Sequence, residues 1–323
     1  MYTATGVKLG DGRFGHVVEV SKDGVLYARK EFIEGEMSYE NKAMEREMME
    51  RVKGCPHLIQ LVDVEENGDL VMERMDGSLW DLMREFQCVP EPILQDMTHH
   101  VLSGLMALKR CGIVHCDLKP ENILYRHTKL TRSGYAFVIG DLGNANEQGS
   151  MTRHFPIQTT EYRCIENVLG TTCMDTCCDM MSLGLILFEA VVGCYIVHTN
   201  YASSEEEQTY KHVMNVLDAV GKNRLARYDT SELPELETYL HDVVTIEGID
   251  TLFPYYFKRY GYLNGEQLID LIQSMLVPFP LQRIRVVDAM MHPWLTPAEA
   301  NTTDSYPLIK NSVPEIDYFF VNV

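Results

Sequence analysis

The sequence predicts a two-lobed α+β fold, in which a small β-rich N-terminal lobe precedes a larger and mainly helical C-terminal lobe. Alternation of apolar and polar residues, which is typical of strands, dominates the first part of the chain around one helical stretch. From about Ser78 onward, apolar residues recur mostly at helical spacing. A chain of 323 residues, of which 46% are hydrophobic, is long enough to bury the core of two lobes.

The elements of the predicted N-terminal lobe are separated by clear turn and stop signals. Lys22, Asp23 and Gly24 lie between the first two predicted strands and suit a tight hairpin turn. Gly54 and Pro56 follow the predicted helix and would end it. The strands are expected at residues 16–20, 25–28, 58–64 and 69–72, and the helix at residues 40–52.

The predicted C-terminal lobe is dominated by two helices with apolar residues at helical spacing. Two short strands flank a polar insertion, and consecutive glutamates indicate an acidic loop farther along the chain. The helices are expected at residues 90–109 and 179–192, the strands at 123–125 and 136–139, the insertion at 126–134 and the acidic loop at 202–208.

The chain is strongly acidic, with a formal net charge of −19. Long-range repulsion makes nucleic acids and anionic membranes poor partners, whereas a basic protein or peptide would be steered toward this surface. The simpler interpretation is that the acidity only keeps the protein soluble. We expect a monomer that makes no direct contact with nucleic acid or membrane.

Features of targeting and redox chemistry predict a protein of the cytoplasm or nucleus. Residues 1–10 lack the basic and apolar regions of a secretory signal. No apolar run approaches the roughly 18 residues that a membrane-spanning helix needs. Nine cysteines, an odd number scattered along the chain, fit reduced thiols.

Two groups of potential metal ligands are not expected to bind a metal. Cys173, Cys177 and Cys178 lack a matching histidine or a second cysteine pair that would complete a tetrahedral site. The adjacent His99 and His100 are expected on a helix, with one ring buried or with both at the surface.

Residues 10–17 read Gly-Asp-Gly-Arg-Phe-Gly-His-Val, a glycine-rich pattern between two strands. Without a Cβ atom, Gly10, Gly12 and Gly15 let backbone N–H groups approach phosphate oxygens closely. A tight hairpin needs glycines too, so the pattern alone does not decide between the two interpretations. It opens a strand rather than a helix, which argues against the Rossmann fingerprint.

Lys30 stands at the end of an alternating strand, where its charge could neutralise the phosphates of a nucleotide. Such a lysine needs an anionic partner that holds it in place. Glu45 in the following helix is the preferred candidate, because Met48 and Met49 supply the apolar face of that helix one turn later. Glu47 is the competing partner, and an ordinary surface lysine and helix glutamate remain the alternative.

Residues 115–122 read His-Cys-Asp-Leu-Lys-Pro-Glu-Asn, and Asp-Leu-Gly follows at residues 141–143 after an apolar strand. In this order and spacing, the two motifs resemble the catalytic loop and the metal-binding turn of protein kinases. The resemblance continues through residue 296. It implies a bilobal kinase domain at residues 1–296, with an N-lobe at about 1–74 and a C-lobe at about 75–296, and a tail at 297–323.

The resemblance implies phosphoryl transfer from ATP, with Mg²⁺, to serine or threonine side chains of proteins. Asp117 would accept the proton of the substrate hydroxyl, and Lys119 would stabilise the transferring phosphate. Thr159 sits where the threonine of the family bonds this aspartate and lysine. Asn122 and Asp141 offer the hard oxygen ligands that Mg²⁺ prefers.

The resemblance also places the nucleotide and the supports of the site. Glu166 would pair with a buried Arg283, and Asp179 would brace the catalytic loop. Met72 would be the gatekeeper beside the nucleotide, and Glu73 and Met75 would offer backbone groups to adenine. The expected ATP-binding residues are Gly10, Gly12, Gly15, Val17, Ala28, Lys30, Glu45, Met72, Glu73 and Met75.

Three departures from the family pattern bear on activity. Cys116 replaces the arginine that reads a phosphate on the activation segment, so we expect activity that does not depend on phosphorylation there. Leu142 replaces phenylalanine, and an apolar side chain still fills the space between the lobes. Cys-Ile-Glu at residues 164–166 replaces Ala-Pro-Glu in the substrate platform. Thr-Glu-Tyr at residues 160–162 is no MAP-kinase activation motif, because it lies too close to Glu166.

Residues 141–145, 157–163 and 252–295 are most similar to SR-protein kinases of the CMGC group, with the dual-specificity tyrosine-regulated kinases as neighbours. The long spacer between the lobes of SR-protein kinases is absent. Because these kinases recognise arginine–serine-rich substrates through acidic surfaces, basic protein substrates are expected here, although a solvated acidic face remains the alternative. The acidic residues that could form such a surface are Glu205, Glu206, Glu207, Asp229, Glu232, Glu235 and Asp242.

Two other functions would use the same fold. A pseudokinase scaffold would bind partners without phosphoryl transfer, but pseudokinases typically lose a residue of the catalytic set. A small-molecule kinase would lack the pattern around Lys119 and the long substrate platform. The residues that an active enzyme needs are all present, namely Lys30, Glu45, Asp117, Asn122 and Asp141.

Overall fold

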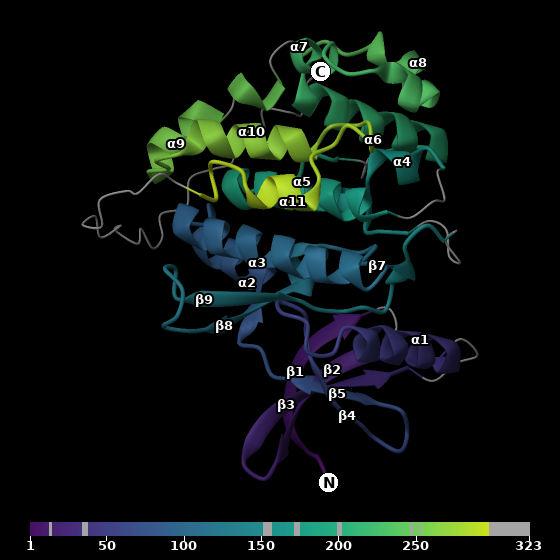
Figure 1. Cartoon of the computed structure of the whole chain (residues 1–323), viewed down its shortest axis with the longest axis vertical. Coiled ribbons are helices and arrows are strands. Elements are labelled where there is room, and N and C mark those ends of the chain that lie inside the picture. Colours follow the sequence, from purple (N-terminus) through teal and green to yellow (C-terminus); the bar gives the residue numbers. More distant parts are fainter. Residues whose placement is uncertain are drawn as a thin grey trace.

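The computed structural model confirms the α+β fold. A five-stranded sheet and one helix form the N-terminal part, and the helices of the C-terminal part stack beyond it in layers (Figure 1). The structure describes residues 1–296 except for 13–14, 34–37, 151–156, 171–174, 199–201, 246–247 and 252, and it leaves the side chains of 38–41, 251, 253 and 256 undescribed. The predicted tail at residues 297–323 lies outside the described residues.

The N-terminal sheet has the strand order β1-β2-β3-β5-β4, and all neighbouring strands are antiparallel. Asp23 and Gly24 have φ angles of 52° and 77°, which fit the predicted hairpin turn between β2 and β3, whereas Lys22 belongs to β2 and pairs with Val25. Glu45, Met48 and Met49 are buried on one face of the helix α1. The bounds are β1 (Thr3–Gly12), β2 (Gly15–Lys22), β3 (Val25–Phe32), α1 (Ser38–Arg51), β4 (Leu61–Val64) and β5 (Leu70–Glu73).

The C-terminal part is built around α5 (Thr176–Val192), whose side chains are almost all buried. A helix that is apolar on nearly every side is stable only inside a core, and α3 (Glu91–Arg110) and α10 (Gly265–Met275) both pack against it. In Figure 1, α3 separates α5 from the ribbon of β8 and β9. This arrangement places the loop between α3 and β8 at the junction with the N-terminal sheet.

The other elements of the C-terminal part are short, except for α6. They are β6 (Gly77–Ser78), α2 (Leu79–Phe86), β7 (Ile113–Val114), η1 (Pro120–Asn122), β8 (Ile123–His127), β9 (Tyr135–Ile139), β10 (Asn146–Glu147), η2 (Thr160–Tyr162), α4 (Ile165–Val168), α6 (Glu205–Val220), α7 (Lys222–Leu225), η3 (Thr230–Glu232), η4 (Pro234–Leu236), α8 (Glu237–Leu240), η5 (Gly248–Thr251), α9 (Phe253–Tyr260) and α11 (Val286–Met290).

The acidic loop predicted at residues 202–208 is wrong in its second half, because α6 begins at Glu205. Ser204 caps this helix, since its hydroxyl accepts a hydrogen bond from the backbone N–H of Glu207 at 3.1 Å. Glutamates in a first helical turn are favourable because they lie at the positive end of the helix dipole.

The strand predicted at residues 58–64 is wrong in its first half, because β4 begins at Leu61. The preceding residues pair with the C-terminal part instead. Leu58 forms an isolated bridge with Ile139, and the backbone N–H of Ile59 donates to the Ile139 carbonyl at 2.9 Å. This segment therefore joins the two parts of the molecule.

None of the helices among the described residues has the length and apolar character needed to cross a membrane. The cysteines described by the structure are all free thiols, and Cys173 lies outside the described residues.

Candidate active site

Lys30 shares one face of the N-terminal sheet with other residues expected around the nucleotide. The register pairs Lys30 with Val17 on β2 and with Leu70 on β5. Ala28, two residues earlier on β3, pairs with Met72. Because paired residues, and residues two apart, project to the same side of a sheet, these side chains line a single face.

Two carboxylates hold the ammonium group of Lys30. Its Nζ donates to both carboxylate oxygens of Glu45 at 2.7 Å, and to Oδ1 of Asp141 at 2.8 Å. Lys30 and Glu45 are buried, whereas Glu47, the competing partner, is exposed. A single side chain thus joins β3, α1 and the Asp-Leu-Gly turn at residues 141–143.

Burial and charge together set the ionisation of this triad. Burial alone would lower the pKa of Lys30, but the carboxylates of Glu45 and Asp141 raise it well above its usual range. Burial raises the pKa of Glu45 to about 7. The positive charge of Lys30 lowers this pKa, and the negative charge of Asp141 raises it. Burial also disfavours the ionised form of Asp141, but the charge of Lys30 outweighs it and lowers the pKa. Glu45 therefore takes up a proton first as the pH falls.

The glycines of the β1–β2 hairpin have different surroundings. A Cβ atom at Gly15 would overlap the backbone oxygen of Glu31, so close packing of β2 against β3 requires glycine there. Among the described residues, which exclude 13–14 of this loop, a Cβ at Gly10 would meet no atom within 4 Å, and one at Gly12 would meet only the Gly15 oxygen at 3.6 Å. Neighbouring protein atoms do not explain these two glycines, whereas close approach of a phosphate to the backbone does.

The segment from Met72 to Met75 leads from β5 into the C-terminal part. The backbone N–H of Glu73 already donates to the Gln60 carbonyl at 3.2 Å. Met72 and Met75 are buried, and within the part of the chain that the structure describes no hydrogen bond involves the backbone N–H of Met75. Met75 is therefore better placed than Glu73 to offer an N–H group to an adenine ring.

Hydrogen-bond donors surround the carboxylate of Asp117. Its Oδ1 accepts from the backbone N–H of Thr159 at 3.0 Å and from the Thr159 hydroxyl at 2.8 Å. Its Oδ2 accepts from Nδ2 of Asn144 at 3.2 Å and lies 3.3 Å from Nζ of Lys119. Lys119 also donates to the Thr159 hydroxyl at 3.4 Å. The structure thus brings together the three residues predicted as catalytic, along with Asn144.

Buried partners hold the backbone that carries Asp117. The backbone N–H groups of His115 and Cys116 donate to the carboxylate of Asp179 at 2.9 and 3.0 Å. Nδ1 of His115 accepts from the backbone N–H of Asp117 at 3.2 Å, so Nε2 carries the proton and donates to the Gly140 carbonyl at 2.9 Å. Cys116 has a φ of 63°, a strained conformation for a non-glycine residue that these contacts stabilise.

Asn122 and Asp141 supply the oxygen atoms expected of a Mg²⁺ site. Nδ2 of Asn122 donates to the backbone carbonyl of Asp117 at 2.8 Å, which leaves the amide oxygen for a cation. The backbone carbonyl of Asn122 accepts from Gly140 at 2.8 Å and so connects the two loops. One amide and one carboxylate oxygen, the latter from a side chain that also bonds Lys30, fit a metal ion held together with a nucleotide.

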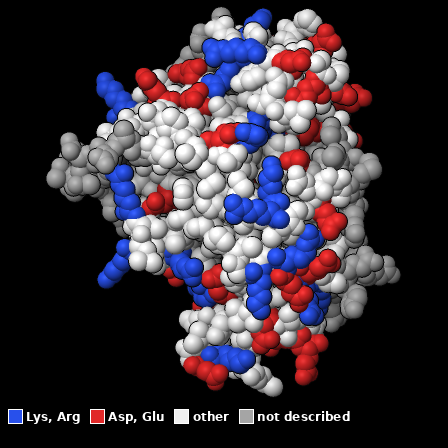
Figure 2. Space-filling model, viewed as in Figure 1, with Lys and Arg blue, Asp and Glu red and all other residues white. Residues whose placement is uncertain are grey.

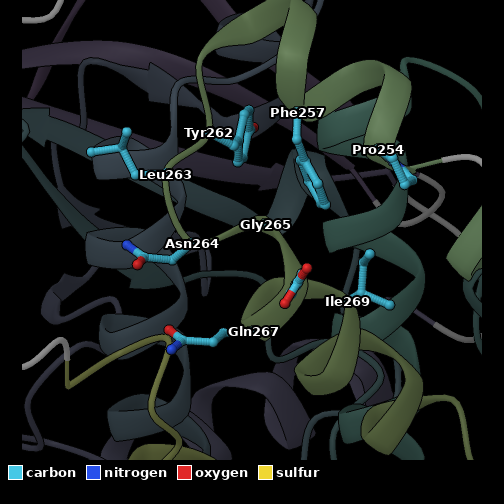
Figure 3. Close-up of a pocket in the computed structure, with 9 residues that line it drawn as sticks. Pro254, Phe257, Tyr262, Leu263, Asn264, Gly265, Gln267 and Ile269 are labelled. Atoms are coloured by element: carbon cyan, nitrogen blue, oxygen red, sulfur yellow. The ribbon is translucent and has the colours of Figure 1, made fainter.

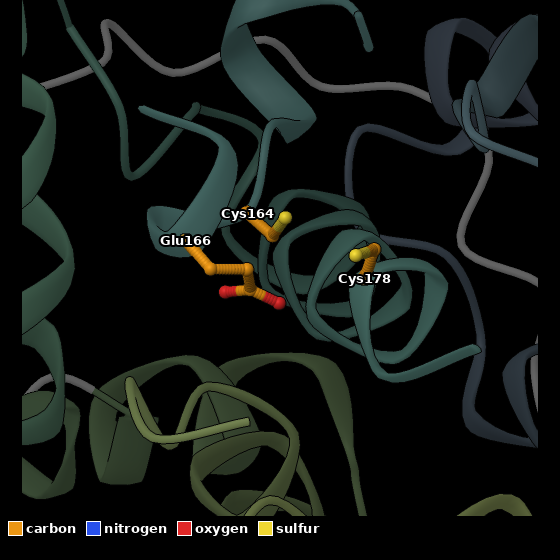
Figure 4. Close-up of side chains that lie close together, drawn as sticks. All are labelled: Cys164, Glu166 and Cys178. Carbon is orange, nitrogen blue, oxygen red and sulfur yellow. The ribbon is translucent and has the colours of Figure 1, made fainter. Parts of the chain in front are cut away.

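A buried ion pair supports the substrate platform. Arg283 donates through Nη1 and Nη2 to the two carboxylate oxygens of Glu166 at 2.7 and 2.9 Å. Cys164 and Cys178 lie beside Glu166, and all three are buried (Figure 4). Burial raises the pKa of Cys164 to about 11, and a hydrogen bond with Cys164 raises the pKa of Cys178. Neutral thiols and a carboxylate already paired with a guanidinium do not suit a metal ion.

Two of the departures from the family pattern are buried. Cys116 is fully buried with Val114 and Ile157, and Leu142 belongs to the main core. Residues 151–156 of the activation segment lie outside the described residues. Activity independent of phosphorylation there stays a prediction, which an assay before and after phosphatase treatment would test.

Sequence reasoning missed two amides that organise the site. Asn144 contacts Asp117, and the buried Gln158 accepts from the backbone of Cys164 at 3.1 Å and donates to the Ser182 hydroxyl at 3.0 Å. Both lie in segments that carry the family resemblance. An uncharged amide has no charge pattern or spacing that marks its partner in advance, so only the three-dimensional contact identifies it.

A hollow of about 360 Å³ lies away from these residues, around the start of α10 (Figure 3). None of the residues predicted for the active site lines it. The lining residues are Pro254, Phe257, Tyr262, Leu263, Asn264, Gly265, Glu266, Gln267 and Ile269.

Comparisons with known proteins agree with this geometry. The family model described as protein kinase domain matches residues 3–295. Over 197 residues, the chain is 32% identical to a probable dual specificity protein kinase YAK1 homolog of Encephalitozoon cuniculi. This alignment covers 57% of this chain and 46% of the relative. It is 25% identical over 280 residues to a probable serine/threonine-protein kinase clkA of Dictyostelium discoideum, covering 75% of this chain and 29% of the relative.

A third relative is covered more fully. The chain is 25% identical over 291 residues to the serine/threonine-protein kinase SRPK of Physarum polycephalum, covering 70% of this chain and 66% of the relative. The chain spans less than half the length of the YAK1 homolog and of clkA.

Proposed function

The chain belongs to the protein kinase domain family, and we propose that it transfers the γ-phosphoryl group of Mg-ATP to serine or threonine hydroxyls of protein substrates. The surroundings of Asp117 carry the proposal, because its carboxylate lies within reach of both Lys119 and Thr159. The pairing of Lys30 with Glu45 and Asp141 supports it, since a lysine held in this way is ordered before a phosphate arrives.

The N-terminal residues would bind and orient the nucleotide. The backbone at Gly10 and Gly12 has the room to approach phosphate oxygens. Lys30 would neutralise phosphate charge, and Asn122 and Asp141 would hold Mg²⁺ through their oxygen atoms. ATP supplies the transferred group when it is bound, and the metal offsets the negative charge of its phosphates.

The residues of the catalytic loop would act on the protein substrate. Asp117 would orient the attacking hydroxyl and accept its proton. Lys119 would place positive charge beside the phosphoryl group as negative charge spreads over its oxygens. Thr159 holds Oδ1 of Asp117 through two hydrogen bonds.

We further propose that the substrates are basic and resemble arginine–serine-rich sequences. The similarity to an SRPK and the net charge of −19 support this specificity. Acidic side chains gather at the α6 and α8 end of the face shown in Figure 2. A cationic peptide that approaches this end would be attracted over a distance of about one Debye length, roughly 8–10 Å.

Not all of the acidic residues expected in a docking surface are equally available. Glu207 forms an ion pair with Lys211 at 2.7 Å and also bonds Ser203. Asp229 and Glu232 bond backbone N–H groups, and Asp242 accepts from the Tyr210 hydroxyl. Among the described residues, no ion pair involves Glu205, Glu206 or Glu235, which makes these three the best candidates for contacts with arginine.

Phosphoryl transfer tests the proposed activity. The wild-type chain is expected to transfer phosphate from Mg-ATP to an arginine–serine peptide, and Asp117→Asn should reduce kcat by at least about 100-fold, since general-base catalysis contributes 10²–10⁴-fold. Lys30→Ala should also abolish transfer while the fold stays largely intact, as circular dichroism would show. A proline-directed peptide serves as the comparison substrate.

The outcomes separate the alternatives. Equal transfer to both peptides would remove the arginine–serine preference and leave the kinase activity standing. Nucleotide binding without transfer to any peptide would instead favour a pseudokinase scaffold. Full activity of Lys30→Ala would contradict the assigned nucleotide site.

A further inference from the structure

Asn144 is the contact of Asp117 to which no role has been assigned. We propose that Asn144 is a positioning residue, which couples the conformation of the Asp-Leu-Gly turn to the orientation of the Asp117 carboxylate. The inference rests on the proposed function, because it assumes that Asp117 receives the proton of the substrate hydroxyl. It stands on the 3.2 Å hydrogen bond from Nδ2 of Asn144 to Oδ2 of Asp117.

The two carboxylate oxygens of Asp117 are not equivalent. Oδ1 accepts two short hydrogen bonds from Thr159, at 2.8 and 3.0 Å. Within the described part of the chain, Oδ2 has the longer contacts with Asn144 and Lys119, at 3.2 and 3.3 Å. Since a weakly held lone pair is easier to offer to an incoming hydroxyl, the geometry points to Oδ2 as the proton acceptor. Asn144 thus bonds the oxygen that does the chemistry.

The direction of the Asn144 amide follows from its partner. An ionised carboxylate only accepts hydrogen bonds, so Nδ2 and not Oδ1 of Asn144 must face Asp117. A donor beside Oδ2 restricts rotation of the carboxyl group. Lys119 supplies positive charge on the same side, but from a long and flexible side chain, whereas the short side chain of Asn144 is directed by its backbone.

The backbone of Asn144 is held by the residues on both sides of it. The backbone N–H of Ala145 donates to the Leu142 carbonyl at 3.1 Å, which closes a turn around Asn144. Nδ2 of Asn146 donates to the Asn144 carbonyl at 2.9 Å, and Asn146 in turn pairs with Val114 on β7. The amide is therefore placed by the turn itself rather than by free rotation of a surface side chain.

This arrangement connects the metal-binding residue to the base within one short segment. Asp141 begins the turn and is held by Lys30 at 2.8 Å, and Asn144 ends it at the Asp117 carboxylate. If the turn moves so that Asp141 leaves Lys30, the amide leaves Oδ2 as well. The base would then be correctly oriented only when the metal-binding carboxylate is also in place.

The test compares Asn144→Leu, which removes the donor at similar volume, with Asn144→Asp, which keeps the shape but places a second carboxylate beside Asp117. We expect Asn144→Leu to lower kcat about 10-fold with little change in the KM for ATP, because Lys30 and Asp141 are untouched. Asn144→Asp should lower kcat farther, through repulsion between like charges.

Asn215→Leu on α6 is the matched control. It also removes an asparagine amide that forms a hydrogen bond, because Oδ1 of Asn215 accepts from the backbone N–H of His198, but this residue lies outside the active site. It should leave kcat unchanged. Wild-type kcat in both Asn144 variants would overturn the proposal. So would a loss of kcat that comes with an equal loss of thermal stability and an equal change in the KM for ATP, since that is a structural effect.

A second measurement does not depend on turnover. The carboxyl ¹³C chemical shift of Asp117 reports its hydrogen bonding, and it should differ between the wild type and Asn144→Leu. If the wild-type chain transfers no phosphate, the proposed function fails, and the ¹³C comparison still decides whether Asn144 positions Asp117. Identical shifts in the two proteins would overturn the coupling.

Discussion

Gly12 and Gly15 form the last pair of the β1–β2 hairpin, but only Gly15 is in close contact with β3. We expect Gly15→Ala to lower the free energy of unfolding by about 1–3 kcal/mol, because its Cβ would overlap the Glu31 backbone. Gly12→Ala is the matched control for stability and should cost less than about 1 kcal/mol. Urea unfolding of both variants checks this. Equal destabilisation would contradict the packing assigned to Gly15.

We expect Glu45 to make nucleotide binding dependent on pH. Burial raises its pKa to about 7, so the carboxylate is protonated below that pH and ionised above it. Protonation weakens the ion pair with Lys30, and we expect the affinity for ATP to fall a few-fold between pH 8 and pH 6. The stability effect has the opposite sign, since a raised folded-state pKa stabilises the protein at low pH and this contribution is lost as the pH rises toward 7.

The control for this pH dependence is Glu45→Gln, which cannot ionise. Its affinity for ATP should be low and nearly independent of pH over the same range, as measured by titration with nucleotide. A pH dependence of the same size in Glu45→Gln would assign the titration to another group.

Charged residues of the site were easier to predict than uncharged residues. Lys30 and Asp117 follow from motifs in which spacing and chemistry agree, and the helical face distinguishes Glu45 from Glu47. The role of Asn144 could not be predicted, because its hydrogen bond with Asp117 depends on the path of the turn at residues 141–143. That turn is distant in sequence from the loop that carries Asp117.

At the scale of elements, the start of α6 shows that one local signal can predict two structures. The run of glutamates predicts a loop by its charge, but a serine followed by acidic residues is also a helix start. We expect Ser204→Ala to lower the free energy of unfolding by about 1 kcal/mol, because the backbone N–H of Glu207 loses its partner. Chemical denaturation measures the change.

Ser203→Ala provides the comparison for this cap. The Ser203 hydroxyl bonds the Glu207 carboxylate in solvent, and its loss should cost at most a few tenths of a kcal/mol. If the two variants are equally stable, Ser204 does not cap α6.

The same limit applies to the strands. The hairpin of β2 and β3 was predictable, because alternation and turn residues agree. β1 (Thr3–Gly12) has mostly exposed side chains and therefore shows no pattern of burial along its length. The start of β4 was misplaced because Leu58 and Ile59 pair with Ile139, eighty residues along the chain, and local sequence does not contain such a contact.

At the scale of the molecule, contacts between distant segments fix how the N-terminal sheet meets the helices. Lys30 reaches Asp141, Ile59 bonds Ile139, and the Arg51 guanidinium donates to the Cys111 carbonyl at 2.8 Å. The order of the two lobes follows from the sequence pattern. Their relative placement, on which the active site depends, follows only from these long-range contacts.

The acidity of the whole molecule leads to the last prediction. If the α6 end attracts basic substrates, Glu205→Gln with Glu206→Gln should lower kcat/KM for an arginine–serine peptide about threefold, as expected from one or two exposed charge pairs. The effect should fade at about 0.5 M salt, because screening shortens the range of the attraction. The same measurement with a neutral peptide should show no change.

The double variant Glu47→Gln with Glu66→Gln is the control. It changes the net charge by the same amount as the α6 double variant, but on exposed residues of the N-terminal part. A loss confined to the α6 pair assigns docking to that end of the molecule, because general attraction to an acidic protein depends only on total charge. Equal losses in both double variants would contradict a docking site and leave the acidity as a property of the solvated surface. The thermal unfolding midpoint of each variant must be compared as well, since Glu205 and Glu206 also lie in the first turn of α6 and contribute to its stability.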